Sequence, residues 1–263
     1  MLHREAGELA ANRSEGVSSE ALEPPSVSTC STPIHLPRFA GEDEVIDLTH
    51  VDTWLFDLDL TLYPPEVELM SQISAHITRF VMTTTGLERD EAFALQKRYF
   101  HQYGTTLSGM VQHHGVDPAS FVSEVEAVTL DAVEPDPRLR AALERLPGRR
   151  LVFTNAGGVY AGRVLARLGV DDLFEDVFHI EAADYVPKPQ AATFERMLKR
   201  HAVDPASTAY FEDMERNLEP AAAAGMTTVL IGPHALTSTA PFVHHRAESL
   251  PPFLEAALIM DRT

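Results

Sequence analysis

Polar side chains able to act as nucleophiles, acids, bases or cation ligands follow four short apolar runs of the sequence. Two aspartates follow the first run, a threonine and an asparagine the second, a lysine in a loop the third, and two acids the fourth. In chain order these residues are Asp57, Asp59, Thr154, Asn155, Lys188, Glu212 and Asp213. Each has an ordinary explanation when taken singly, because such residues often form turns or cap helices. Together they offer a nucleophile, an acid or base, and oxygen ligands for a hard cation.

The apolar runs that precede these side chains predict the strands of a parallel sheet. They are short and rich in β-branched and aromatic residues, as in strands buried on both faces. The four runs span 51–56, 151–154, 176–180 and 208–211, and a fifth run of the same kind spans 227–232. Helical patterns separate the later runs, for example the apolar face of Val164, Leu165 and Leu168. This alternation predicts an α/β fold with a doubly wound, Rossmann-like parallel sheet, in which sites form at the carboxyl ends of strands.

The stretch between the first and second runs is exceptional. Residues 64–148 carry no strand pattern but contain amphipathic helical patterns, and they far exceed an ordinary connection in length. We therefore expect a helical cap inserted after the first strand, with the core at 47–63 and 149–233. Residues 1–46 are rich in Ser, Pro and Glu and are expected to be a disordered N-terminal extension. Residues 234–263 are expected to form a C-terminal tail whose helix packs on the core or on a second copy of the chain, which leaves a homodimer open.

The polar segments resemble the four sequence motifs of the haloacid dehalogenase (HAD) superfamily. The matching segments are FDLDLTLYP (56–64), FTNAG (153–157), PKP (187–189) and FEDMERNL (211–218). They occur in the family's order, and the resemblance covers about residues 51–232. The segments LTLYP, YGTTLSGM (103–110), TNAG and FEDMERNLEPA further resemble the pyrimidine 5′-nucleotidase branch of that superfamily.

This resemblance implies a phosphomonoester hydrolase that works through an aspartyl-phosphate. Asp57 would attack phosphorus as the nucleophile. Asp59 would protonate the leaving oxygen and then deprotonate the attacking water, which requires a raised pKa in the first step. Two carboxylates are needed because Asp57 is covalently occupied during the second step.

Magnesium is the cofactor that the resemblance implies. Several carboxylates and a phosphate repel one another by about 4 kcal/mol per pair at about 4 Å and an effective dielectric near 20, and Mg²⁺ suits carboxylates plus phosphate. Its ligands would be the Asp57 carboxylate, the Asp59 carbonyl and Asp213, with Glu212 bound directly or through water. Relatives often have a second acid where this chain has Asn217, so Glu212 is the expected source of the extra charge.

The phosphoryl group would be held by three further residues. Lys188 would offset negative charge on the nucleophile and the phosphoryl group, and Thr154 and the Asn155 amide would bind phosphoryl oxygens. One position departs from the family pattern: Leu60 stands where relatives commonly have Asn or Gly. A bulkier residue there is expected to alter the backbone around the metal.

The cap is expected to close over the pocket and to contact the leaving group, so that it selects the substrate. By resemblance, Tyr63, Tyr103, Thr105 and Thr106 would face the substrate. Tyr103 also fits a core aromatic at helical spacing, and the two interpretations carry equal weight. Ser108 replaces an Arg that relatives often have, so one contact to phosphate or base is expected to be missing.

Composition limits the partners. The chain of 263 residues has 21 Lys and Arg against 39 Asp and Glu, a net charge of -18. Such a charge repels nucleic acid and anionic membranes, so the expected partner is a small phosphorylated metabolite, most simply a nucleoside monophosphate. Cys30 is the one cysteine, which fits a reducing compartment. No apolar run resembles a secretory signal or a membrane span, so a cytoplasmic location is expected.

Other functions stay open at this point. A phosphatase or mutase of small sugar phosphates has the same core residues. A haloacid dehalogenase needs neither Asp59 nor the two acids at 212–213, so the presence of these residues argues against that function. A phosphonatase needs a reactive lysine in the cap, where Lys97 is the only lysine and belongs to a charged helical face. A phosphoacceptor signalling domain lacks so large an insert. A weakly active or non-catalytic binding protein of the same fold remains compatible with Leu60.

Overall fold

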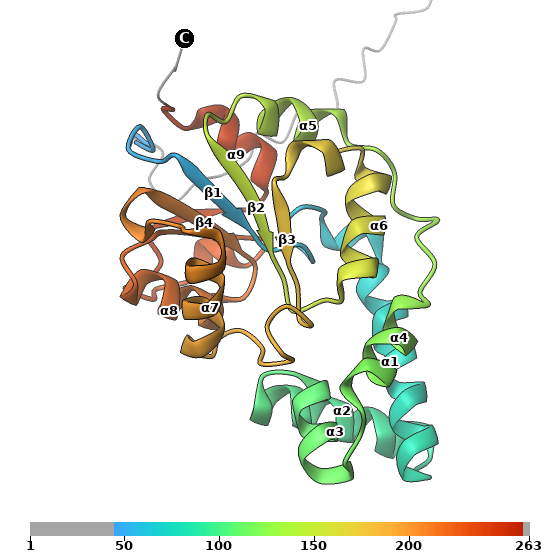
Figure 1. Cartoon of the computed structure of the whole chain (residues 1–263). Helices are drawn as coiled ribbons and strands as arrows, with labels where there is room; N and C mark the ends of the chain where they lie inside the picture. The colour runs from blue at the N-terminus through green and yellow to red at the C-terminus, as the bar shows by residue number, and fades with distance from the viewer. Residues whose placement is uncertain (1–44, 260–263) are drawn as a thin grey trace, which may run out of the picture. The chain divides into compact units, whose positions relative to one another are not determined.

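A six-stranded parallel sheet forms the centre of the computed structural model, which describes residues 45–259 (Figure 1). The strand order is β3-β2-β1-β4-β5-β6, and every pair is parallel. The strands are β1 (Thr53–Phe56), β2 (Arg149–Phe153), β3 (Asp176–Phe178), β4 (Thr208–Glu212), β5 (Thr227–Ile231) and β6 (His245–Ala247). The chain winds outward in one direction from β1 and in the other from β4, so the sheet has its topological switch point between these two strands.

Nine helices longer than one turn are present in residues 45–259, and they divide into two groups. Helices α5 (Pro137–Glu144), α6 (Gly158–Leu168), α7 (Ala191–His201), α8 (Glu215–Ala223) and α9 (Leu250–Ala256) accompany the sheet. Helices α1 (Leu69–Thr85), α2 (Arg89–Tyr103), α3 (Thr106–His114) and α4 (Pro118–Glu126) lie between β1 and β2 in the chain. Four short 3-10 helices, at Pro65–Val67, Asp171–Leu173, Pro205–Ser207 and Ala235–Thr237, complete the elements.

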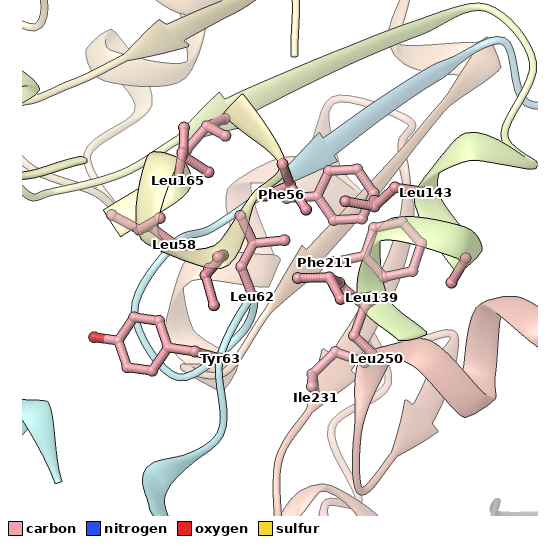
Figure 2. Close-up of a cluster of buried hydrophobic side chains, with 14 of the residues drawn as sticks. Phe56, Leu58, Leu62, Tyr63, Leu139, Leu143, Leu165, Phe211, Ile231 and Leu250 are labelled. Atoms are coloured by element: carbon pink, nitrogen blue, oxygen red, sulfur yellow. The ribbon is translucent and has the colours of Figure 1, made fainter. Parts of the chain in front are cut away.

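Both faces of the sheet are covered by helices, which explains why the strands read as continuous apolar runs. Residues of α5, α6 and α9 share one buried cluster with Phe56, Phe211 and Ile231 of the strands, and Figure 2 shows this cluster. The rings of Phe56 and Phe211 stack across β1 and β4 with centroids 4.8 Å apart. Residues of α7 and α8 form a second cluster with Leu55 and Tyr210.

The four helices α1 to α4 have their own apolar cluster, which also takes in Ile180 from the loop after β3. Local sequence signals define their ends. The Thr105 hydroxyl caps α3 by accepting from the Ser108 N–H at 3.1 Å, and Asp117 caps α4 in the same way ahead of Pro118. The close packing of α2 on α3 depends on Gly109, because a Cβ there would lie 2.3 Å from the Tyr99 ring.

The predicted fold class is confirmed: the sheet is parallel and doubly wound, and a helical cap follows the first strand. In the C-terminal segment, β6 pairs with β5, which the sequence did not predict, and α9 packs into the core cluster, which is one of the two placements expected for a terminal helix. Helix α5, assigned from the sequence to the cap, packs into that same core cluster. The finer domain boundaries stay a prediction, and the extension at 1–46, with Cys30, lies outside the described residues except for Val45 and Ile46.

Within residues 45–259, no helix is both long enough and apolar enough to cross a membrane.

Candidate active site

Strand register places the first two acids of the site side by side. Phe56 of β1 pairs with Phe211 of β4, so the next residues, Asp57 and Glu212, leave the two central strands at the same level. The Asp57 N–H continues the ladder by donating to the Phe211 carbonyl at 2.9 Å. Two leucines that follow Asp57 anchor this turn in the core: Leu58 and Leu62 lie in the cluster shown in Figure 2. The site therefore forms at the switch point of the sheet, as expected for this architecture.

Lys188 is the buried cation of the site. Its side chain is 1% exposed, and its ammonium donates to Asp57 at 2.8 Å and to Glu212 at 2.9 Å. Two more oxygens lie within hydrogen-bond distance of its three N–H groups, the Phe153 carbonyl at 2.7 Å and the Tyr210 hydroxyl at 2.9 Å. An ammonium this deeply buried is stable only with such complete pairing.

The two acids bound to Lys188 differ in their proton affinity. Burial and the neighbouring Glu212 raise the pKa of Asp57 to about 7, against the lowering effect of Lys188. Burial also acts to raise the pKa of Glu212, but Lys188, the Met214 N–H and the Asn217 amide outweigh it, so that pKa is lowered. The site thus favours the ionised form of Glu212 more strongly than the ionised form of Asp57.

A third acid, Asp213, completes a group with the chemistry of a cation site. One carboxylate oxygen from each of Asp57, Glu212 and Asp213 lies within 4.8 Å of the others. Burial, Glu212 and Asp57 together raise the pKa of Asp213 to about 10, which shows how strongly the site disfavours a third bare negative charge. The Asn217 side-chain carbonyl nearby is buried without a hydrogen-bond partner. This all-oxygen donor set fits Mg²⁺.

Glu212 has less freedom to bind a metal than the other two acids. Its Oε1 accepts from Lys188, from the Tyr210 hydroxyl at 3.3 Å and from the Asn217 amide. Its Oε2 accepts from the Met214 N–H at 2.7 Å. The Asp57 and Asp213 carboxylates therefore offer the freer oxygens for a cation.

Asp59 lies beside two tyrosines. Its Oδ1 accepts hydrogen bonds from the Tyr63 hydroxyl and, at 2.8 Å, from the Tyr160 hydroxyl, and the two hydroxyls are 3.2 Å apart. Burial raises the pKa of Asp59 above its ordinary value, although the two hydroxyls act in the opposite direction. A carboxyl held in this way has a fixed orientation and a raised proton affinity, as a general acid requires.

Leu60 adopts the left-handed conformation that the family's usual Asn or Gly would adopt more easily. Its φ angle is 61°, a region that costs an ordinary side chain about 1–2 kcal/mol. The turn is retained, with the Leu62 N–H donating to the Leu58 carbonyl at 3.0 Å. The substitution is thus accommodated as local strain.

Thr154 and Asn155 follow β2 into the same cavity. The Thr154 hydroxyl is buried and accepts from the Ala156 N–H at 3.0 Å. The Asn155 side chain bonds to the main chain of Lys188, accepting from its N–H at 2.8 Å and donating to its carbonyl at 3.3 Å. Asn155 therefore positions the loop that carries the lysine, in addition to the amide role expected from the sequence.

A cavity of about 410 Å³ opens above these residues between the sheet and the cap. All seven strand-end residues line it except Glu212, which lies beneath. Of the four expected cap contacts, Thr105 and Thr106 line the cavity. Tyr63 instead bonds to Asp59, and Tyr103 packs on Tyr99 and bonds to His113 at 2.5 Å, so neither is among the lining residues.

Three site residues were not anticipated: Tyr160, Tyr210 and Arg216. Tyr210 had a usable signal, since it lies two residues before Glu212 and so shares its face of the strand. Tyr160 lies in the first turn of α6, directly after the FTNAG segment. Arg216 lies in the first turn of α8 and lines the cavity.

The doubly wound sheet, the cap after β1 and the aspartate–lysine cluster define a capped α/β enzyme architecture built around strand-end aspartates. A sequence model described as haloacid dehalogenase-like hydrolase matches residues 54–231. The chain belongs to this family.

Individual relatives show similarity over part of the chain. The chain is 25% identical over 194 residues to phosphate metabolism protein 8 of Saccharomyces cerevisiae, covering 67% of this chain and 60% of the relative. It is 35% identical over 122 residues to fructose-1-phosphate phosphatase YqaB of Escherichia coli, covering 43% and 63% respectively. The chain thus spans less than two thirds of the length of these two relatives. A solved HAD phosphatase from Thermococcus onnurineus shares the fold, with a TM-score of 0.54, 17% identity, and coverage of 78% of this chain and 97% of that one.

Proposed function

We propose that this protein is a Mg²⁺-dependent phosphomonoester hydrolase that forms an aspartyl-phosphate on Asp57. The observation that carries the proposal is the division of labour between two neighbouring aspartates. Asp57 is paired with the buried ammonium of Lys188 at 2.8 Å, whereas Asp59 is bonded to two tyrosine hydroxyls. A nucleophile and a separate proton donor are what phosphate transfer through a covalent intermediate requires.

In the first step, a carboxylate oxygen of Asp57 attacks phosphorus and the ester oxygen departs. Asp59, whose protonated form is favoured by burial and a raised pKa, gives its proton to that oxygen. Lys188 offsets the charge that Asp57 and the phosphoryl group bring together, and Thr154 offers a buried hydroxyl to a phosphoryl oxygen. Positioning and charge neutralisation supply most of the catalysis in such reactions.

In the second step, water attacks the phosphorus of the aspartyl-phosphate. Asp59, now ionised, accepts a proton from this water and so returns to its starting state. Inorganic phosphate leaves and the Asp57 carboxylate is regenerated. Tyr63 and Tyr160 stabilise the ionised form of Asp59 by donating hydrogen bonds to it.

Asp57, Asp213 and the Asp59 carbonyl would hold the magnesium ion, with Glu212 as a charged neighbour. Bound there, the ion supplies positive charge to the phosphoryl oxygens. The need for such charge is visible in the three carboxylates within 4.8 Å, of which Lys188 pairs directly with two.

A nucleoside monophosphate, in particular a pyrimidine one, is the proposed substrate, on the strength of the resemblance to the 5′-nucleotidase branch. A small sugar phosphate is the second candidate, because YqaB bears the name of a fructose-1-phosphate phosphatase. The single cysteine of the chain supports a proposed cytoplasmic location.

Phosphate release from a substrate panel tests this proposal. The panel contains nucleoside monophosphates and sugar phosphates, each with Mg²⁺ and with EDTA. We expect release that depends on Mg²⁺ and is abolished in Asp57→Asn, whereas the exposed Asp131→Asn serves as the matched control. Activity that persists in Asp57→Asn or in EDTA would overturn the mechanism. If the wild type releases phosphate from none of the esters, the alternative of a non-catalytic binding protein is left.

The covalent intermediate has its own test. With 4-nitrophenyl phosphate, the leaving group departs without needing a proton, so Asp59→Asn should still form the aspartyl-phosphate but hydrolyse it slowly. Mass spectrometry of the acid-quenched variant should then detect a phosphoryl adduct on the peptide that contains Asp57. An adduct on any other peptide contradicts the assignment.

A further inference from the structure

The upper part of the cavity is apolar. Its walls above the strand ends include Met70, Ile73, Ile77, Phe121, Val122 and Val125, which come from α1 and α4. The charged residues concentrate at the floor, near the phosphoryl position. A leaving group covered with hydroxyls would lose its hydration against such walls without gaining partners. The walls favour a leaving group that is largely apolar or has flat apolar faces.

Arg216 brings a charge to this otherwise apolar region. It lies one residue into α8, three residues after Asp213, and its side chain reaches the cap. The guanidinium lies over the Phe100 ring, 4.7 Å from its centroid, and Nη2 donates to the Gly104 carbonyl at 3.0 Å. Arg216 therefore links the core to the end of α2.

Donor groups of Arg216 remain unused. Its Nε is buried without a hydrogen-bond partner. No residue in the described range 45–259 accepts a hydrogen bond from Nη1 or forms an ion pair with Arg216. Two other charged residues of the cavity are engaged by the protein itself: Lys188 pairs with two carboxylates, and Glu126 accepts from the Val159 and Tyr160 N–H groups. A ligand oxygen could accept the hydrogen bonds that this half-buried guanidinium does not make within the protein.

We propose that Arg216 determines leaving-group specificity by donating to an acceptor oxygen on a flat, otherwise apolar ring held in the cap chamber. This inference rests on the proposed function and deepens it. A pyrimidine base combines the two properties, since its faces suit the apolar walls and its ring carbonyls accept hydrogen bonds. Phe100 and Gly104 hold the guanidinium in place, so little conformational freedom is lost when the acceptor arrives.

Relative specificity for three phosphate esters tests the role of Arg216. Uridine 5′-monophosphate has a flat ring with carbonyl acceptors, phenyl phosphate has a ring without acceptors, and ribose 5-phosphate has the sugar without the ring. In Arg216→Met, the ratio of kcat/KM for uridine 5′-monophosphate to that for phenyl phosphate should fall by about 10- to 100-fold, the effect of losing one charge-assisted hydrogen bond. General damage to the fold lowers both values and leaves their ratio unchanged.

The matched control is Arg98→Met, since Arg98 also lies over an α2 ring, that of Tyr99, but is exposed and does not line the cavity. Its ratio should equal that of the wild type. Arg216→Lys keeps the charge and loses the planar fork, so it should lower the ratio by less, and it replaces Arg216→Met if that variant does not fold.

Three results would overturn the proposal. One is an unchanged ratio in Arg216→Met. Another is an equal loss for all three esters, which would place Arg216 on the phosphoryl group or in cap packing. The third is a fall for ribose 5-phosphate as large as that for the nucleotide, which would place the acceptor on the sugar.

Failure of the proposed function is distinguishable from failure of this inference. If the wild type hydrolyses none of the three esters, calorimetric dissociation constants for the same ligands and variants replace kcat/KM. A selective loss of uridine 5′-monophosphate binding in Arg216→Met then supports the role of Arg216 in a non-catalytic protein. Equal binding in wild type and variant overturns it.

Discussion

Replacing Lys188 by methionine removes the cation that holds the two central acids of the site. The ammonium is 2.8 Å from Asp57 and 2.9 Å from Glu212, and the lysine is 1% exposed. Methionine matches the length of most of the lysine stem, so the change removes the charge and its hydrogen bonds but keeps most of the apolar packing. Asp57 and Glu212 are left close together and almost fully buried, without their shared partner.

The structure sets the scale of the effect. The Coulomb attraction of Lys188 to each of the two carboxylates is about 6 kcal/mol at an effective dielectric of about 20. Much of this attraction is balanced by the cost of burying the charges. Removing one partner of a buried pair typically costs about 3–5 kcal/mol. For a domain of about 200 residues, this corresponds to a fall in Tm of about 6–20 °C. Turnover should fall severely as well, because the charge of Asp57 is no longer offset.

Denaturant unfolding in EDTA measures the change in the free energy of unfolding without a bound metal. The exposed Lys199→Met is the matched control and should stay within about 0.5 kcal/mol of the wild type. Adding Glu212→Gln to Lys188→Met should restore part of the loss, because the second orphaned charge is then removed. A loss below about 1 kcal/mol in Lys188→Met would refute the reasoning that the pair is buried and ionised. Near-normal turnover would remove Lys188 from the site.

Three further predictions concern the metal, the strained turn and a surface ion pair. Mg²⁺ at about 100 times its dissociation constant should stabilise the protein by about 2.7 kcal/mol in thermal unfolding, and Asp213→Asn should abolish most of this gain. Leu60→Asn should raise the free energy of unfolding by up to about 1 kcal/mol, because asparagine tolerates a positive φ better. Glu255 binds Arg138 through two hydrogen bonds of 2.8 and 2.6 Å, which lower the pKa of the carboxyl. Glu255→Gln should therefore cost at most about 1 kcal/mol at neutral pH, and the difference from wild type should shrink as the pH falls through the lowered pKa.

Specific results would contradict each of these predictions. An equal Mg²⁺ effect in Asp213→Asn would place the ion elsewhere. A clear loss of stability in Leu60→Asn would show that the packing of Leu60 on the core outweighs its backbone strain. For Glu255, the sign follows from a folded pKa below the unfolded one: the stabilisation exists above the unfolded pKa and is lost on acidification. A difference in the free energy of unfolding between Glu255→Gln and the wild type that grows at acidic pH would contradict this prediction.

The family and the strand-end residues could be recognised from the sequence because their signals are local. Buried parallel strands appear as short apolar runs, and the residue after each run lies at the same edge of the sheet. Asp57, Thr154 and Asp213 were accessible in this way, whereas Lys188 lies in the loop between β3 and α7 and was found through the PKP segment. Strand β6 was missed because its three residues, His245–Ala247, are too short and polar to show a strand pattern.

The sequence by itself determined which acids and which hydroxyl stand at the strand ends, since those positions depend only on where each strand stops. Tertiary structure decided what surrounds them. Asp59 and Tyr160 are separated by 101 positions in the chain, and Arg216 and Gly104 by 112, so no local pattern could reveal either contact. Burial, which raises the pKa of Asp59 and leaves Arg216 with unused donors, arises only when the cap and the helices pack against the sheet. Proton affinity and the pairing of donors are for that reason properties of the packed site, whereas the identity of its polar groups is already present in the sequence.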